Sequence, residues 1–255
     1  MLMFAGVGRT VMSAVGHLAG AGTLLVRTLA SVARLRPRSL RVVARVTARQ
    51  ILFTGVQAVL PLTVAAIAVG TLVLYEAVLY LPAEYIETAS VAILIREVIP
   101  LLTAFLLIGR SGTAITIEVG TMKLNDELGA LTVMGIPFEH FVMLPRLIGM
   151  VVSFALLQVY ADVAALAGGY LVSELIQGHA LSFPLGNLLR AVDPEDLSLS
   201  LLKVCLFGVV VAVMAAEHGL AVGPSRRDVP IATTRALVHS LLLCFLINTA
   251  VSLTL

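Results

Sequence analysis

The chain has few charged and few aromatic side chains. Of its 255 residues, 13% are Asp, Glu, Lys or Arg, aromatic residues make up 5%, and tryptophan is absent. Soluble domains carry about 25% charged residues. This deficit, together with 59% hydrophobic residues and a mean hydropathy of +1.04, argues against an ordinary soluble domain and indicates a polytopic membrane protein.

Cysteine and recognisable catalytic motifs are also scarce. The two cysteines, Cys205 and Cys244, lie in apolar segments without a CxxC spacing, which favours buried free thiols over a disulfide or metal site. The five histidines are scattered along the chain and none forms HExxH. GxxxxGK[ST] and GxSxG are absent as well. We therefore expect no catalytic site, no metal and no cofactor bound by this chain.

Acidic residues are missing from positions 1–50, which contain eight arginines. Five of these arginines are spaced to fall on one face of a helix, with Pro37 interrupting its start: Arg34, Arg38, Arg41, Arg45 and Arg49. Such a stripe predicts an interfacial amphipathic helix that faces anionic headgroups. Nucleic-acid binding is the alternative, but the stripe lacks interleaved aromatics and runs directly into an apolar segment.

Five long apolar segments follow the basic region, each at least as long as the ~20 residues that span a bilayer. We therefore predict an all-α fold in one domain, residues 1–255, with basic helices over 1–49 and five spans. The expected spans are about 51–81, 88–117, 141–173, 197–216 and 236–255.

The connections between these spans differ in charge. Segments 81–90 and 177–196 are acidic on balance, whereas the N-terminal region and 217–235 are basic. By the positive-inside rule, the N-terminus and segments 118–140 and 217–235 are expected in the cytoplasm, and the C-terminus on the outer side.

The second cytoplasmic segment carries the signals of a short helix. Asn125 is a good N-cap, Asp126 and Glu127 suit the positive end of the helix dipole, and Gly135 followed by Pro137 ends the helix. One apolar stripe runs along it: Leu124, Leu128, Leu131 and Met134. We predict a helix over 126–134, roughly 14 Å long, which is either a passive connector or a docking helix for a cytoplasmic partner.

Several charged residues fall inside the predicted spans, where a charge requires a partner or a polar cavity. Arg96 and Glu97 are adjacent and point about 100° apart on a helix, so each requires another partner. They form either a structural polar network or the polar lining of a cavity. Arg110 is expected to pair with Glu118 or Asp162, chiefly in a structural role. The small residues Ala161, Ala165 and Gly169 predict a closely packed helix face.

Two stretches resemble the MlaE/YrbE family of ABC-transporter permeases. They are REVIPLLTAFLLIGRSGTAITIEVGTMKLNDELGALTVMG, which continues to LPR at 144–146, and IATTRALVHS at 231–240. The resemblance implies a homodimeric permease of the bacterial inner membrane, paired with a cytoplasmic ATPase that binds ATP and Mg²⁺ and with an external MCE-domain protein, that moves phospholipid or a related lipid. It also implies that the segment after the second span is the coupling helix on the ATPase.

The resemblance further assigns a lipid pocket between the two subunits to the positions of Tyr80, Arg96 and Glu97. Glu76 is a departure, because the family has an apolar residue there. Asn125-Asp126-Glu127 replaces the usual T-E-Q, and Pro137 follows Ile136 directly. Two other classes compete: a proton-coupled secondary transporter that uses Glu97 and Asp162, and a membrane-embedded lipid-modifying enzyme. The lack of an inverted repeat disfavours the first, and the lack of a clustered catalytic set disfavours the second.

Overall fold

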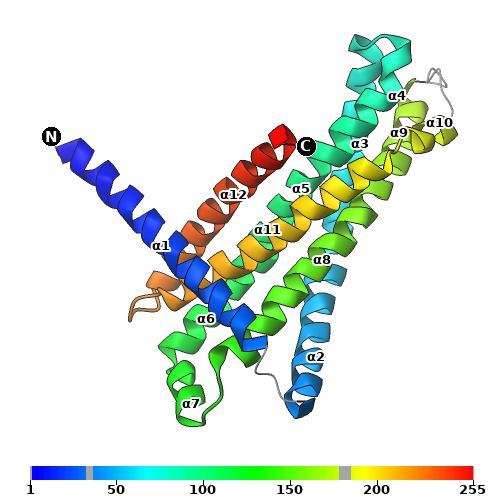
Figure 1. Ribbon diagram of the computed structural model, residues 1–255. Helices are drawn as coiled ribbons and strands as arrows, with labels where there is room; N and C mark the ends of the chain where they lie inside the picture. Colours follow the sequence, from blue (N-terminus) through cyan, green and yellow to red (C-terminus); the bar gives the residue numbers. More distant parts are fainter. Residues whose placement is uncertain (1, 33–36, 178–184, 255) are drawn as a thin grey trace. The chain divides into compact units, whose positions relative to one another are not determined.

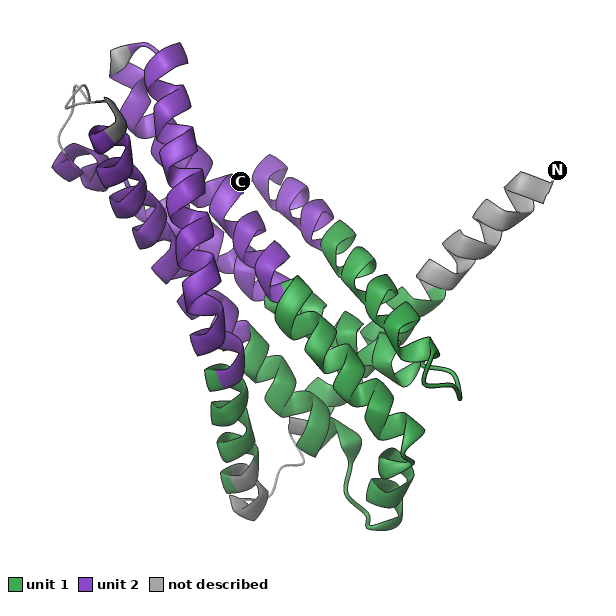
Figure 2. Cartoon of the chain, turned by 180° about the vertical axis from the view of Figure 1, so that it is seen from behind, with its two compact units in different colours: residues 1–52, 108–150, 208–243 green, residues 53–107, 151–207, 244–255 purple. Residues whose placement is uncertain are grey.

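The computed structural model describes residues 2–32, 37–177 and 185–254. This part of the chain is helical and contains no strand (Figure 1), which confirms the all-α prediction. It divides into two compact units (Figure 2), residues 1–52, 108–150 and 208–243 in unit 1 and residues 53–107, 151–207 and 244–255 in unit 2. The boundaries between the units fall inside long helical segments.

The helices include five short π-helical segments, labelled η. Four of them continue directly from one α-helix into the next, and η4 leads into α8. The elements are α1 (Leu2–Val32), α2 (Pro37–Ile51), η1 (Leu52–Val56), α3 (Gln57–Tyr80), α4 (Ala83–Ala92), η2 (Ile93–Val98), α5 (Ile99–Leu107), η3 (Ile108–Gly112), α6 (Thr113–Leu124), α7 (Glu127–Val133), η4 (Glu139–Met143), α8 (Leu144–Val163), η5 (Ala164–Gly168), α9 (Gly169–Gln177), α10 (Leu185–Arg190), α11 (Pro194–Leu220) and α12 (Asp228–Thr254).

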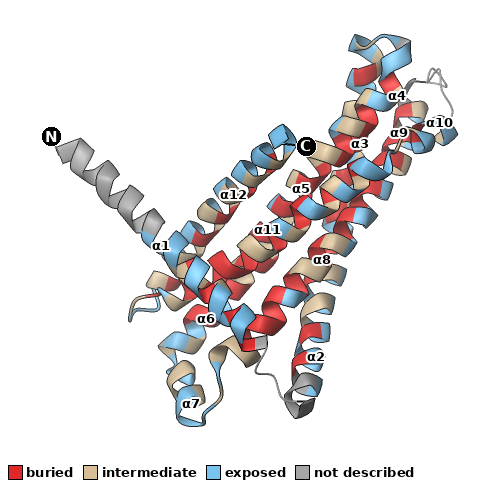
Figure 3. Cartoon of the chain, in the orientation of Figure 1, coloured by how far each residue is buried: buried red, intermediate tan, exposed pale blue. Residues whose placement is uncertain are grey.

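Five helical segments are long and apolar enough to cross a membrane, as predicted: Val43–Tyr80, Glu84–Leu124, Glu139–Leu175, Pro194–Leu220 and Asp228–Thr254. All five helical segments begin before the predicted start of the span, and the second, third and fourth also end after its predicted end. The prediction was shorter because it used hydropathy, whereas the helices continue into charged residues at their ends. The first and the fifth are the least buried (Figure 3).

The basic N-terminal region forms two helices, α1 and α2. Pro37 is the first residue of α2, a position where its missing N–H costs nothing. Arg41, Arg45 and Arg49 are exposed on α2 while Val43 and Thr47 are buried, which confirms an amphipathic helix. Arg34 lies outside the described residues.

Unit 1 is held together where α6 meets the end of α11. A Cβ at Gly219 would lie 2.8 Å from the Val119 side chain and 3.0 Å from the Thr116 carbonyl oxygen, and one at Gly120 would lie 2.9 Å from Val222. Glycine is therefore needed on both helices for the two backbones to approach this closely.

Unit 2 is built around α3, which packs against η5 and α9. A Cβ at Gly70 would collide with the backbone carbonyl of Ala165, and a Cβ at Gly169 would lie 2.6 Å from the carbonyl carbon of Gly70. Ala161 and Ala165 are fully buried. The small-residue face predicted at Ala161, Ala165 and Gly169 is therefore confirmed as a close helix contact.

Candidate functional site

The short helix between the second and third spans is present as α7, Glu127–Val133. Its N-cap is Asp126, with φ of +56°, rather than the predicted Asn125, which instead ends α6 and donates from Nδ2 to Glu127 Oε1 at 3.1 Å. The prediction of Asn125 as N-cap is wrong because α6 continues through Leu124 and the chain must turn sharply before a new helix begins. The helix is correspondingly shorter than 126–134.

The end of α7 follows the prediction closely. Gly135 has φ of +68°, its N–H donates to the Thr132 carbonyl at 3.0 Å, and the N–H of Ile136 donates to the Leu131 carbonyl at 2.9 Å. These two bonds make a Schellman motif, which satisfies the last carbonyls of the helix and requires a left-handed residue.

The exposed face of α7 differs in part from the predicted apolar stripe (Figure 3). Leu128 and Leu131 are half-buried, whereas Met134 is 62% exposed and Val133 is 90% exposed. Sequence reasoning missed Val133 because it lies off the i, i+4, i+7 row. An apolar side chain this exposed at the tip of a connection is available for a partner.

Lys123 joins the base of α7 to α11. Its ammonium donates to the carbonyl oxygens of Leu220 and Val222, both at 2.7 Å. A cation at these last carbonyls also suits the negative end of the helix dipole. Two charged hydrogen bonds therefore link the last turn of α6, directly before α7, to the end of α11.

Glu118, one turn before this lysine, pairs with a residue that sequence reasoning did not consider. Its carboxylate lies 2.8 Å from Nη2 of Arg146, and that buried guanidinium also donates to the Val142 carbonyl at 2.8 Å. Arg146 is the last residue of the LPR triplet, so the pair ties the second span to the start of the third.

Asp162, the third member of the predicted network, lies in unit 2. It is 4% exposed and accepts a hydrogen bond from Gln158 Nε2 at 2.9 Å. Arg110 is half-buried in the π-helical segment η3 of unit 1. A single network of Arg110, Glu118 and Asp162 stays a prediction.

Arg96 and Glu97 lie in the π-helical segment η2 of unit 2. The Arg96 guanidinium forms an ion pair with Asp196 at the start of α11. Glu97 is instead bound from α11 and α12, so each residue has its own partner, as predicted. π-Helical turns are often found at functional sites, because the extra residue redirects the side chains.

The carboxylate of Glu97 is the centre of a polar cluster. It accepts bonds from Lys203 Nζ at 3.0 Å, from Ser252 Oγ at 2.6 Å and from Asn248 Nδ2 at 2.6 Å. Lys203 is 2% exposed and also donates to the Arg96 carbonyl at 2.6 Å and to Ser252 at 2.7 Å. Sequence reasoning missed Lys203, although it is the lone charge in the apolar run of the fourth span, which was a usable signal.

Tyr80 and Glu76 lie one turn apart at the end of α3, also in unit 2. Both are exposed, Tyr80 to 78%. Exposure of these two side chains on an otherwise apolar span leaves them available to a lipid or to a second chain.

The histidines are not scattered in space. His17 of α1 stacks on His218 of α11 with ring centroids 4.5 Å apart, and His218 Nε2 lies 3.0 Å from Nδ1 of His239 on α12. Their spacing along the sequence did not indicate this contact, because α1 meets helices more than 190 residues later in the chain. No cluster of His, Cys, Asp or Glu in the described part has a geometry that could hold a metal ion.

Known proteins match most of the chain. The family model described as permease MlaE matches residues 47–254. A probable ABC transporter permease protein of Rickettsia bellii is 29% identical over 64% of this chain and 63% of its own. The intermembrane phospholipid transport system permease protein MlaE of Haemophilus influenzae is 28% identical over 75% of this chain and 76% of its own.

A plant protein is among the relatives. The chloroplastic protein TRIGALACTOSYLDIACYLGLYCEROL 1 of Arabidopsis thaliana is 26% identical over 62% of this chain and 45% of its own. The chain thus covers 63% of the length of the Rickettsia bellii protein and 45% of that of the plant protein, less than two thirds in each case. With the family model covering residues 47–254 and five helices able to cross a membrane, the chain belongs to the MlaE family of permeases.

Proposed function

We propose that this chain is the membrane permease of an ABC transporter that moves phospholipid between the inner membrane and an external MCE-type carrier. The observation that carries the proposal is α7, an exposed helix that ends in a Schellman motif and lies between two spans of an MlaE-family chain. Lys123, just before α7, forms hydrogen bonds to the end of α11. A passive connector has no need of an exposed Val133 and Met134 at its tip.

The energy comes from a cytoplasmic ATPase that binds ATP and Mg²⁺. Closure of the ATPase on α7 moves Lys123 and with it the end of α11, and the Glu118–Arg146 pair carries the same displacement to the third span. This chain contributes binding and movement, and hydrolysis takes place on the partner.

The lipid is held at Tyr80, Arg96 and Glu97, with Glu76 at the edge. The Arg96 guanidinium presents a planar fork suited to a headgroup phosphate, and the Lys203–Glu97 pair keeps it in place through the hydrogen bond from Lys203 to the Arg96 carbonyl. Two chains form the pocket together. The first and fifth spans, the least buried of the five, supply the apolar surface for that contact or for lipid.

The same assignment places the protein in a bacterial inner membrane with a cytoplasmic N-terminus and an outer C-terminus. Basic residues at Arg226, Arg227 and Arg235 support a cytoplasmic α11–α12 connection.

Reconstitution tests the proposal. The protein is purified with its ATPase, placed in proteoliposomes containing fluorescent phospholipid and mixed with the external carrier. We expect lipid transfer that requires ATP, and Arg96→Ala and Glu97→Ala to lower the transfer more than the yield of the complex. Transfer driven by a proton gradient without any ATPase would favour the secondary transporter and overturn the proposal.

A further inference from the structure

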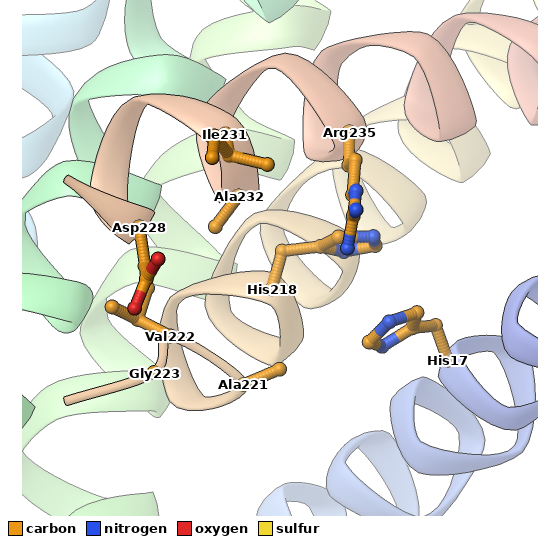
Figure 4. A pocket seen from close by; sticks show the side chains of 9 residues that line it. All are labelled: His17, His218, Ala221, Val222, Gly223, Asp228, Ile231, Ala232 and Arg235. Carbon is orange, nitrogen blue, oxygen red and sulfur yellow. The ribbon is translucent and has the colours of Figure 1, made fainter. Parts of the chain in front are cut away.

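Unit 1 contains a polar cavity between three of its helices. A cavity of about 220 Å³ opens between α1, the end of α11 and the start of α12 (Figure 4). Its polar lining consists of two imidazoles, one guanidinium and one carboxylate: His17, His218, Arg235 and Asp228. Alanine, valine, isoleucine and glycine residues complete it.

Arg235 has no ion-pair or hydrogen-bond partner within residues 2–32, 37–177 and 185–254. Its side chain extends from α12 toward the ring of His218 (Figure 4). A guanidinium held beside imidazoles, with no carboxylate in an ion pair with it, attracts an anion, and its planar fork fits phosphate oxygens best.

Of the two histidines that line the cavity, His218 has both ring nitrogens engaged, whereas His17 contacts a carboxylate at one nitrogen. The Met214 carbonyl can only accept, so His218 donates to it from Nδ1 at 2.9 Å, and Nε2 of the same ring is bonded to His239. His17 lies 3.9 Å from the Glu217 carboxylate, and that carboxylate lies against the α1 backbone at Gly20. The edge of His17 that faces the cavity is left for a ligand together with Arg235.

The carboxylate of Asp228 places a negative charge in the lining of the cavity. Figure 4 shows Asp228 on the opposite side of the group from His17 and Arg235. One of its oxygens accepts the Ser225 N–H at 3.2 Å, which leaves the other unassigned. A cavity with a cationic end and an anionic end suits a zwitterion, with a phosphate at Arg235 and an ammonium at Asp228.

The position of the cavity along α12 matches the headgroup level of a bilayer. From Arg235 to Thr254 the helix rises about 29 Å at 1.5 Å per residue, close to the hydrocarbon thickness of about 30 Å. Leu18 beside His17, and Ile231 and Val238 on α12, are 42%, 51% and 46% exposed. Acyl chains of a lipid whose headgroup fills the cavity have apolar side chains to lie against.

We propose that this cavity binds the phosphoethanolamine headgroup of a phospholipid from the cytoplasmic leaflet. Arg235 and His17 hold the phosphate and Asp228 holds the ammonium. Lipid binding in this cavity requires neither ATP nor the transport cycle, so it can be tested independently of the proposed function.

The test is the lipid that the full chain retains. The protein is extracted from membranes in mild detergent, and bound phosphatidylethanolamine and phosphatidylglycerol per chain are quantified by mass spectrometry. We expect Arg235→Gln to bind phosphatidylethanolamine about tenfold more weakly, the loss of one charged hydrogen bond. Arg227→Gln, an exposed cation outside the cavity, is the matched control and retains wild-type levels.

A second variant keeps the result decisive if the first is unstable. Asp228→Asn keeps the acceptor for Ser225 but loses the charge, and should lower retention of phosphatidylethanolamine but not of phosphatidylglycerol. Retention unchanged in both variants overturns the proposal. Inorganic phosphate is the other source of this chemistry. If it raises the melting temperature of wild type but not of Arg235→Gln while lipid retention is equal, the ligand is free phosphate and the lipid assignment is wrong.

Discussion

The ammonium of Lys203 lies 3.0 Å from a carboxylate oxygen of Glu97, and this lysine is 2% exposed. A buried lysine pays a large desolvation penalty, and only a set of partners such as the one seen here offsets it. Lys203 donates to three oxygen atoms, on Glu97, Arg96 and Ser252, which matches the three protons of an ammonium group.

The first prediction concerns this pair. Lys203→Met removes the buried charge but leaves Glu97 with only neutral donors, and Glu97→Gln leaves the lysine without its counter-charge. We expect each single variant to lose about 3 kcal/mol of stability, seen as a lower melting temperature in detergent.

The double variant Lys203→Met with Glu97→Gln is the control for that pair. Because no unpaired charge remains buried, its loss should be clearly smaller than the sum of the two single losses. Additive losses would show that the two residues are not coupled.

The second prediction concerns the tip of α7. Val133→Asp places a charge on the most exposed apolar side chain of the helix without disturbing its packing. We expect the ATPase to be lost from the purified complex while the amount of membrane-inserted protein stays the same. Val133→Ile is the matched control and should keep the ATPase. An unchanged ATPase yield in Val133→Asp would remove Val133 from the contact.

The third prediction uses the left-handed end of α7. Gly135→Ala forces a Cβ into φ of +68°, which costs about 1 kcal/mol, so the last turn of α7 should fray and ATP-driven lipid transfer should fall. Gly135→Asn should be milder, because Asn tolerates this conformation better. Equal transfer rates for the two variants would argue that the end of α7 does not need this geometry.

The fourth prediction tests the connection from α7 to α11. Lys123→Met removes both hydrogen bonds to the Leu220 and Val222 carbonyls. We expect ATP hydrolysis to continue while lipid moved per ATP falls severalfold, because the ATPase still binds α7 but no longer moves α11 as strongly. Lys123→Arg keeps the charge at the helix end and should restore part of the ratio. If Lys123→Met moves as much lipid per ATP as the wild type, the hydrogen bonds of Lys123 do not transmit movement from α7 to α11.

Much of the fold could be predicted from the sequence because it depends on local properties. Span length and hydropathy follow from composition, so all five membrane-spanning helices were found. The small-residue contact of α3 with Gly169 was also predictable, since small residues four apart share one helix face. The end of α7 at Gly135 could be predicted because few residues other than glycine adopt a positive φ.

Helix boundaries and partners were less predictable. Asn125 has a high propensity for the N-cap position, yet α6 continues to Leu124 and Asp126 is the N-cap of α7. Arg146 was not proposed as the partner of Glu118 because ion pairs between spans depend on rotation of the helices. π-Helical segments such as η2 add one residue to a turn and change that rotation without a sequence signal.

The number of spans, the amphipathic helix before them and the capped helix between the second and third follow from the amino-acid sequence alone, because hydropathy, spacing and backbone preference act within a few residues. Helix packing, by contrast, brings Lys203 to Glu97, Lys123 to the end of α11 and His17 to His218 beside Arg235. Each of these joins residues about 100 to 200 positions apart, and their meeting depends on how whole helices pack.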